Sequence, residues 1–248
     1  MRTLTLCLGN SSLFGGVFAG RSVTPFRLER TKWAGLKPIL REAGPINRAV
    51  LCSVVPALTK SVTALIRRET GIAAAELTAE SPHGLAIGYR QPGRLGTDRL
   101  AAALGARAKF AGENVIVVDC GTATTVTALQ HGRTLAGGAI LPGFSLWPEM
   151  LARRTAQLPK IAPGRPAAAL GRSPEEAIAS GIFFGHVGAI REVTAAVARE
   201  AFGREQFIVA GTGGHALELR REKLFTVFEP ELILHGLLSF ASTLPDHA

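Results

Sequence analysis

The sequence predicts an α/β protein with a duplicated fold, in which two similar domains enclose a cleft. Two stretches share one pattern, an apolar strand followed by a glycine turn and a second strand: TLTLCLGNSS near the start and VIVVDCGTATT near the middle. The 248 residues are 47% hydrophobic and 19% charged, which suits a compact globular protein with a sizeable core. We expect domains at 1–112 and 113–248, with ligands bound in the cleft between them.

The first domain is predicted to open with strand, turn and strand over residues 4–23, bent at glycines. The apolar run AVLCSVVP, which stops at Pro56, is typical of a strand buried on both faces. Helical spacing of apolar residues marks three segments: 31–42, 57–71 and 99–110. The stretch SPHGLAIGYRQPGRLGTDR between the last two helices is rich in loop residues.

The second domain is predicted to begin with three strands joined by turns over residues 114–143. A long helix follows over 173–203, with Ser173 and Glu176 spaced as a capping box. Strand, glycine turn and helix are expected in QFIVAGTGGHALEL, and PELILHGLLSFAS closes the chain as a helix. Each domain therefore carries strands and helices of its own.

The charge and the cysteines limit the class of protein. The formal net charge is +9, which favours anionic partners such as nucleotides and phosphates. The basic residues are scattered without aromatic interleaving, so most are expected on solvated helix faces and a nucleic-acid partner is not expected. No apolar run is long enough to span a bilayer, and no secretory signal is visible. The three widely spaced cysteines favour a reducing cytoplasm over a disulfide framework or a zinc site.

The stretch DCGTATT could bind phosphate, because a glycine lets the backbone approach closely and threonine hydroxyls and amides can donate. Its Asp119 could hold Mg²⁺, directly or through water, or a monovalent cation, since hard cations prefer oxygen ligands. A β-hairpin whose Asp and Thr satisfy turn hydrogen bonds is the alternative. The stretches GNSS and GTGGHA give two further glycine turns after apolar strands, and neither is a Walker loop.

The stretch YRQPGRLGTDR places Asp98 and Arg99 where a loop turns into a helix. An arginine can bind a substrate carboxylate in a fork, and an aspartate can accept the proton of a hydroxyl during phosphoryl transfer. The alternative is a helix N-cap at Asp98 and a surface Arg99. The histidines show no metal spacing, so His186 and His215 are interpreted as structural residues.

Eight short motifs in order along the chain resemble the type III pantothenate kinases of the actin-like, acetate- and sugar-kinase superfamily. They are GNSS, SVVP, YRQPGRLGTDR, DCGTATT, GGAILPG, TAQLP, AIASGIFFGHVG and GTGGHA. The resemblance implies a duplicated ribonuclease-H-like fold and a homodimer with active sites at the subunit interface. It implies transfer of the ATP γ-phosphoryl group to the hydroxyl of pantothenate, the first step of coenzyme A synthesis. A sugar or acetate kinase is disfavoured by the short length and the Gly-x-Asp-Arg motif.

The resemblance also implies a role for each matching residue. Asp98 would be the catalytic base, and Arg99 would meet the pantothenate carboxylate. Asp119 would ligate K⁺ or NH₄⁺. Ser173 would stand for the threonine that the partner subunit contributes to the pantothenate site. The other pantothenate-binding residues would be Tyr89, Gly96 and Thr97, and the ATP-binding residues would be Gly9, Asn10, Ser11, Gly121, Thr122, Ala123 and Thr124.

The first glycine turn departs from the family pattern Asp-x-Gly-Asn-Thr/Ser, because Cys7 stands where the acid is expected. In the family this acid positions Mg²⁺ at the ATP phosphates, and a thiol is a poor ligand for Mg²⁺. Loss of the acid is expected to impair chemistry more than nucleotide binding. Two interpretations remain: an active kinase that tolerates Cys7, or a weak or inactive family member that acts as a binding or regulatory protein.

Overall fold

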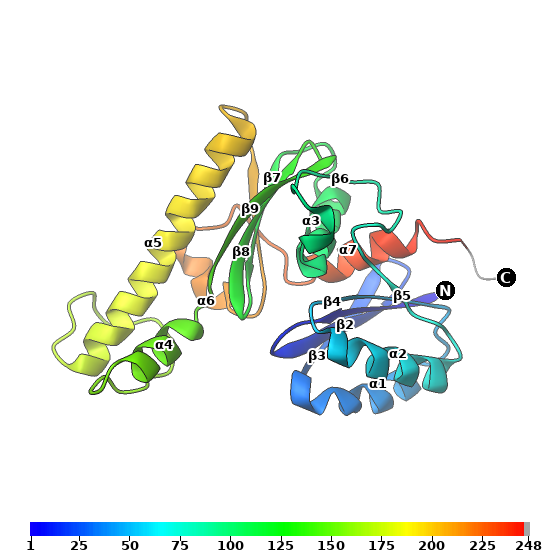
Figure 1. Ribbon diagram of the computed structural model, residues 1–248, viewed down its shortest axis with the longest axis horizontal. Helices are drawn as coiled ribbons and strands as arrows, with labels where there is room; N and C mark the ends of the chain where they lie inside the picture. The colour runs from blue at the N-terminus through cyan, green and yellow to red at the C-terminus, as the bar shows by residue number, and fades with distance from the viewer. Residues whose placement is uncertain (246–248) are drawn as a thin grey trace. The chain divides into compact units, whose positions relative to one another are not determined.

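The computed structural model describes residues 1–245 and divides the chain into two compact units (Figure 1). The first unit contains residues 1–112, 132–135 and the chain from 231 onward. The second contains residues 113–131 and 136–230. The first unit thus includes the C-terminal helix, whereas the expected domain 113–248 would place that helix in the second unit. A helix can join a distant unit because its apolar face packs wherever the complementary surface lies.

The first unit is built on a five-stranded sheet with the order β3-β2-β1-β4-β5. Strand β1 pairs antiparallel with β2 and parallel with β4, which places the carboxyl ends of β1 and β4 at the same edge of the sheet. The bounds of these strands are β1 Arg2–Leu8, β2 Ser12–Ala19, β3 Ser22–Glu29, β4 Arg48–Ser53 and β5 Ala75–Glu76.

Helices cover both faces of this sheet. The leucines at alternate positions of β1 pack on α1 and α2, and the opposite face carries α3 and α7 (Figure 1). Helices α3 and α7 approach closely because a Cβ at Gly105 would collide with the Leu232 carbonyl, and one at Gly236 with the Ala101 carbonyl. The helices are α1 Leu36–Glu42, α2 Pro56–Thr70, α3 Thr97–Lys109 and α7 Leu232–Ala241, with 3₁₀ turns at Arg30–Gly35 and Pro92–Arg94.

The sheet of the second unit has the order β11-β10-β7-β8-β9, in which β7 pairs antiparallel with β8 and parallel with β10. Strand β6 (Ala86–Ile87) extends this sheet by pairing with Thr134 and Leu135, which belong to the first unit as β6 does. The bounds are β7 Val115–Cys120, β8 Ala123–Gln130, β9 Thr134–Pro142, β10 Ile208–Thr212 and β11 Val227–Phe228.

The helix α5 (Pro174–Phe202) covers one face of this second sheet (Figure 1). Its apolar residues pack on the side chains of alternate residues in β7 and β8, including Val118, Cys120 and Val126. The other helices of the unit are α4 Leu146–Arg154 and α6 Ala216–Leu219, followed by a 3₁₀ turn at Arg220–Glu222. The odd-numbered residues of β7, including Asp119, lie on the face opposite to α5.

The duplicated α/β fold predicted from the sequence is confirmed, with local differences. The segment expected as one helix from Thr31 begins as a 3₁₀ turn and becomes α-helical at Leu36. The helix predicted after GTGG is only four residues long. Helix α4 was not predicted, because Pro148 interrupts its sequence and only a few apolar residues mark its periodicity.

Candidate active site

The first unit brings two predicted motifs to one edge of its sheet. The first glycine turn follows β1, and the Gly-x-Asp-Arg motif begins α3 beside the end of β4. The Thr97 hydroxyl donates to the Ser53 carbonyl oxygen at 2.9 Å and accepts from the Ser53 N–H at 3.1 Å. Through these two hydrogen bonds Thr97 holds the start of α3 in place, and its role in pantothenate binding stays a prediction. The next residue, Asp98, is thereby fixed at the same edge.

The Asp98 carboxylate is half-buried in the first turn of α3, and its Oδ1 accepts the Arg99 N–H at 2.8 Å. Burial raises the pKa of Asp98 above its usual value of 3.8, although the Arg99 N–H and charge oppose this shift. A raised pKa makes the carboxylate a stronger base. The N-cap of the helix is Gly96, so the alternative of Asp98 as the N-cap is wrong.

The Arg99 side chain is buried, with 4% of its surface exposed. Its Nη1 donates to the Tyr89 hydroxyl, and its guanidinium carbon lies 5.4 Å from the centre of the Tyr89 ring. The alternative of a surface arginine at this position is therefore wrong. Tyr89 also lines an open pocket of about 390 Å³ together with Arg90, Gln91 and Arg94. Two arginines beside this pocket favour an anionic occupant.

The first glycine turn is a tight loop closed by the Gly9 N–H, which donates to the Ser12 carbonyl oxygen at 2.9 Å. The Asn10 and Ser11 side chains are exposed at its tip, and the Ser11 carbonyl accepts the Arg30 N–H at 2.9 Å. Polar side chains at an exposed glycine turn are suited to donate to phosphate oxygens.

Cys7 lies in β1 in register with Cys52 of the parallel neighbour β4. Both are buried, and a side-chain hydrogen bond between them is the largest cause that raises the pKa of Cys52. Burial and the negative charge of Asp98 raise this pKa further. A buried pair of thiols does not fit Mg²⁺, which prefers oxygen ligands. Within residues 1–245, moreover, no three His, Cys, Asp or Glu side chains cluster as metal ligands.

The second unit brings together three turns that contain glycine, at Gly121, Gly143 and Gly213. The second turn is closed by the Gly121 N–H, which donates to the Ala123 carbonyl oxygen at 3.1 Å. A Cβ at Gly143 would collide with the carbonyl oxygens of Gly121 and Thr122, and one at Gly213 with the Asp119 carboxylate. Glycine is required on both sides of the second turn because the backbones approach so closely.

Asp119 and Thr124 point to opposite faces of the sheet. Thr124 is fully buried on the face that α5 covers, and its Oγ1 lies 3.4 Å from Nε2 of His186. Its side chain therefore supports the second turn from inside. The Asp119 Oδ1 lies instead beside Gly213, whose φ of +92° is rarely adopted by residues with a side chain.

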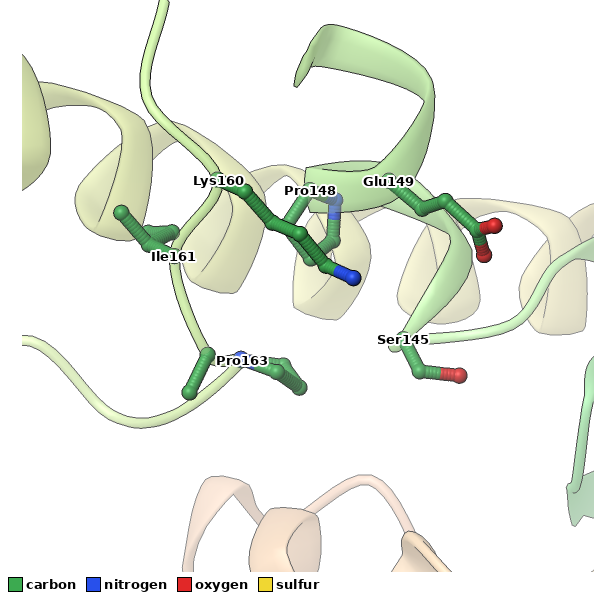
Figure 2. Close-up of a pocket in the computed structure, with 7 residues that line it drawn as sticks. Ser145, Pro148, Glu149, Lys160, Ile161 and Pro163 are labelled. Atoms are coloured by element: carbon green, nitrogen blue, oxygen red, sulfur yellow. The ribbon is translucent and has the colours of Figure 1, made fainter. Parts of the chain in front are cut away.

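A surface pocket of about 460 Å³ is lined by residues that come after Gly143 in the sequence. Figure 2 shows it between the first turn of α4 and the segment 160–163, with the polar groups of Ser145, Glu149 and Lys160 around it. No sequence pattern predicted this pocket, because its two walls are separated by the loop after α4.

Comparison with known proteins identifies the family. The family model of type III pantothenate kinases matches residues 3–196. A type III pantothenate kinase of Legionella pneumophila (strain Paris) is 36% identical over 94% of this chain and 96% of its own length. The chain belongs to the type III pantothenate kinase family.

A type III pantothenate kinase phosphorylates pantothenate in the biosynthesis of coenzyme A, and this is the activity of the chain. Two solved structures share the fold. The putative Baf family transcriptional activator from Campylobacter jejuni has a TM-score of 0.60 with 19% identity, and covers 97% of this chain and 98% of its own. The ROK hexokinase from Thermus thermophilus has a TM-score of 0.50 with 16% identity, and covers 98% of each chain.

Ser173 is the N-cap of α5. Its hydroxyl accepts the Glu176 N–H at 3.2 Å, while the Glu176 carboxylate accepts the Arg172 N–H at 2.7 Å. The predicted capping role is confirmed, and a role in the pantothenate site stays a prediction. None of the helices within residues 1–245 is long and apolar enough to cross a membrane.

Proposed function

We propose that Asp98 is the base that accepts the proton of the pantothenate hydroxyl during phosphoryl transfer. The observation that carries this role is the half-buried carboxylate with a raised pKa, held by the Thr97–Ser53 hydrogen bonds. Deprotonation strengthens the hydroxyl oxygen as a nucleophile toward the γ-phosphorus, and the proton passes to the Asp98 carboxylate. Gly96 is required beside it, since a Cβ there would lie 2.6 Å from Oδ1 of Asp98.

Arg99 and Tyr89 are proposed to recognise the carboxylate of pantothenate. Their mutual hydrogen bond holds the guanidinium beside the ring. The pocket at Tyr89 adds Arg90 and Arg94, which supply further positive charge for an anionic substrate. Arginine suits this role because its planar fork matches a carboxylate.

Two of the three predicted glycine turns, those at Gly9 and Gly121, are proposed to bind ATP phosphates. Asn10 and Ser11 would donate to phosphate through their side chains, and Thr122 and Ala123 through their backbone amides. Gly9 and Gly121 would shape the turns, because their own N–H groups already donate to carbonyl oxygens within the turns. Thr124 would contribute through the backbone, since its side chain is buried. Such turns attract phosphate through their backbone amides.

Under this proposal the turn at Gly121 has a cation ligand, Asp119, and the turn at Gly9 has none at position 7. The Asp119 carboxylate is an oxygen ligand that suits K⁺ or NH₄⁺, and these ions would add positive charge near the second turn. The thiol pair of Cys7 and Cys52 does not fit Mg²⁺. Any Mg²⁺ bound to ATP would therefore be held without a ligand from position 7.

A homodimer is proposed from the exposed face of α5. A Cβ added at Gly181, Gly185 or Gly188 would meet no atom within 4 Å, and the neighbouring Phe184 is 44% exposed. Small residues beside an exposed aromatic side chain let another helix approach closely. Ser173 at the start of the same helix would then reach the partner's pantothenate site. A cytoplasmic location is part of the proposal, because the three cysteines are free thiols.

The test is phosphopantothenate formation by the purified protein with ATP, Mg²⁺ and K⁺, beside the variant Asp98→Asn. The amide keeps the shape of the carboxylate and cannot accept the proton. We expect turnover to fall by at least about a hundredfold while ATP binding remains, since a general base contributes about 10²–10⁴-fold. Unchanged turnover in Asp98→Asn would exclude Asp98 as the base. Sedimentation of the native protein as a monomer with full pantothenate affinity would contradict the role of Ser173.

A further inference from the structure

A group of aromatic rings lies behind the glycine turns of the second unit, and we call it the aromatic cluster: Phe144, Trp147, Phe183, His186 and His215. Phe144 is fully buried and directly follows Gly143, which contacts the second turn. Its ring stacks on His186 with 5.4 Å between centroids, and meets His215 edge-on at 6.1 Å. The cluster therefore connects the segments that carry the turns at Gly121, Gly143 and Gly213.

His186 is the member of the cluster that contacts the second turn through a polar atom. It lies on α5 and is fully buried. Its Nε2 lies 3.4 Å from Thr124 Oγ1, while its Nδ1 is buried without a hydrogen-bond partner in the described part of the chain. Burial, and then the nearby His215, lower the pKa of His186 to about 4, so the ring is neutral at pH 7.

The position of the proton on this neutral ring follows from its surroundings. A proton on Nδ1 would leave a buried N–H without an acceptor, which costs free energy. The Trp147 indole N–H, in a ring 6.2 Å away, is another buried donor without a partner among residues 1–245. A lone pair on Nδ1 avoids adding a second unpaired donor to the cluster. These surroundings favour the proton on Nε2, which then donates to Thr124 Oγ1.

We propose that His186 is a positioning residue for the ATP-binding turn and acts through the Thr124 hydroxyl. The inference rests on the proposed role of residues 121–124 in ATP binding. Thr124 follows Ala123, whose carbonyl oxygen closes the turn by accepting the Gly121 N–H. By fixing the Thr124 rotamer, the hydrogen bond from His186 fixes the backbone at the point where β8 leaves the turn. The amides of the turn then keep one orientation toward phosphate.

The kinetic test compares His186→Phe, His186→Gln and Thr124→Val with the native protein. Phenylalanine keeps an aromatic ring and loses the donor, whereas glutamine keeps an N–H donor near the position of Nε2. We expect His186→Phe and Thr124→Val each to raise KM for ATP about three- to tenfold, with KM for pantothenate unchanged, since one neutral hydrogen bond is lost. His186→Gln should restore most of the ATP affinity, and the double variant should be no worse than either single variant.

The matched control is Thr194→Val on the same helix. The Thr194 hydroxyl is buried and has no hydrogen-bond partner in the described chain, so its removal tests a change to α5 alone. KM for ATP should be unchanged in this variant. Equal changes in KM for both substrates, or additive effects in the double variant, would overturn the proposal.

A spectroscopic measurement keeps the inference separate from the proposed function. The ¹⁵N chemical shifts of the His186 ring, assigned by their loss in His186→Gln, report which nitrogen carries the proton. We expect the neutral Nε2–H tautomer at pH 7, and loss of the hydrogen-bonded signal in Thr124→Val. An Nδ1–H tautomer would refute the inference even if the kinase is active. Absence of ATP binding by the native protein would instead refute the proposed role of the turn.

Discussion

Thr97 and Ser53 hold each other through two hydrogen bonds, with the Thr97 hydroxyl as donor in one and acceptor in the other. This pair ties the first turn of α3 to the end of β4, although the residues are 44 positions apart. The proposed base Asp98 follows Thr97 directly, so its placement depends on this contact.

We predict that Thr97→Val lowers both stability and activity. Valine has the shape of threonine without the hydroxyl, and leaves the Ser53 N–H and carbonyl without this partner. The free energy of unfolding should fall by about 2 kcal/mol, and kcat should fall because Asp98 moves. Urea denaturation and initial rates measure both effects. Thr97→Ser keeps both hydrogen bonds and serves as the control; an equal loss in that variant would show that the methyl group matters instead.

We predict that Gly213→Ala is strongly destabilising and Gly214→Ala is not. Gly213 has φ +92°, and a Cβ there would collide with the Asp119 carboxylate and the Cys120 backbone. A Cβ at Gly214 would meet no atom within 4 Å. In Gly213→Ala the free energy of unfolding should fall by about 2 kcal/mol or more, and activity should respond less to K⁺. Thermal unfolding and a K⁺ titration test this, and similar results for the two variants would contradict the close approach of Gly213 and Asp119.

We predict that Cys7→Asp raises kcat and lowers stability. The new carboxylate restores the acid of the family pattern, but it would be buried beside Cys52 and feel the charge of Asp98. The matched control is Cys7→Asn, which has the same shape without the charge. Phosphopantothenate formation at saturating ATP, Mg²⁺ and K⁺ decides the outcome. A folded Cys7→Asp protein with no gain over Cys7→Asn would show that the missing acid does not limit catalysis.

We predict that the free energy of unfolding decreases as the pH falls from about 6.5 to about 4, because His186 takes up a proton more readily in the unfolded state. The pKa of His186 is lowered from 6.5 to about 4 by burial and by His215, so the unfolded state binds the proton first. The contribution of the neutral His186 to the free energy of unfolding is fully present above pH 6.5. It decreases by roughly 3 kcal/mol as the pH falls to the pKa of the folded state. Denaturation at several pH values should show a flatter profile for His186→Gln. Identical slopes would mean that the pKa of His186 is the same in the folded and unfolded states.

The strands and the long helices were predictable from local sequence. Leucine recurs at every second position of β1, and β4 and β7 each contain four consecutive apolar residues. Gly71 ends α2 in the left-handed conformation expected for a C-cap. Helix α5 begins where its capping box predicted, at Ser173. Helix α4 escaped prediction because its sequence carries no comparable cap or stripe. The ATP-binding roles of the glycine turns were implied by the order of family motifs along the chain, and local residue spacing alone did not assign them.

The relations that shape the candidate site were not predictable, because they join residues far apart in the chain. The Thr97 hydroxyl is bound to Ser53, 44 positions away. Arg99 is buried against Tyr89, which excludes the surface position that local sequence left open as the alternative to a substrate role. His186 looked structural, and only its distance to Thr124 shows which turn it supports.

The sequence by itself determined the succession of strands, turns and helices, the family, and the substitution of the first-turn acid by Cys7. These depend on residue order, side-chain periodicity and glycine positions, which are local properties of the chain. Only the tertiary structure decided that Cys7 pairs with Cys52, that Gly213 borders Asp119, and that the C-terminal helix belongs to the first unit. Such contacts follow from burial and close packing between distant segments, where the shape and polarity of the partner surface decide which side chains meet.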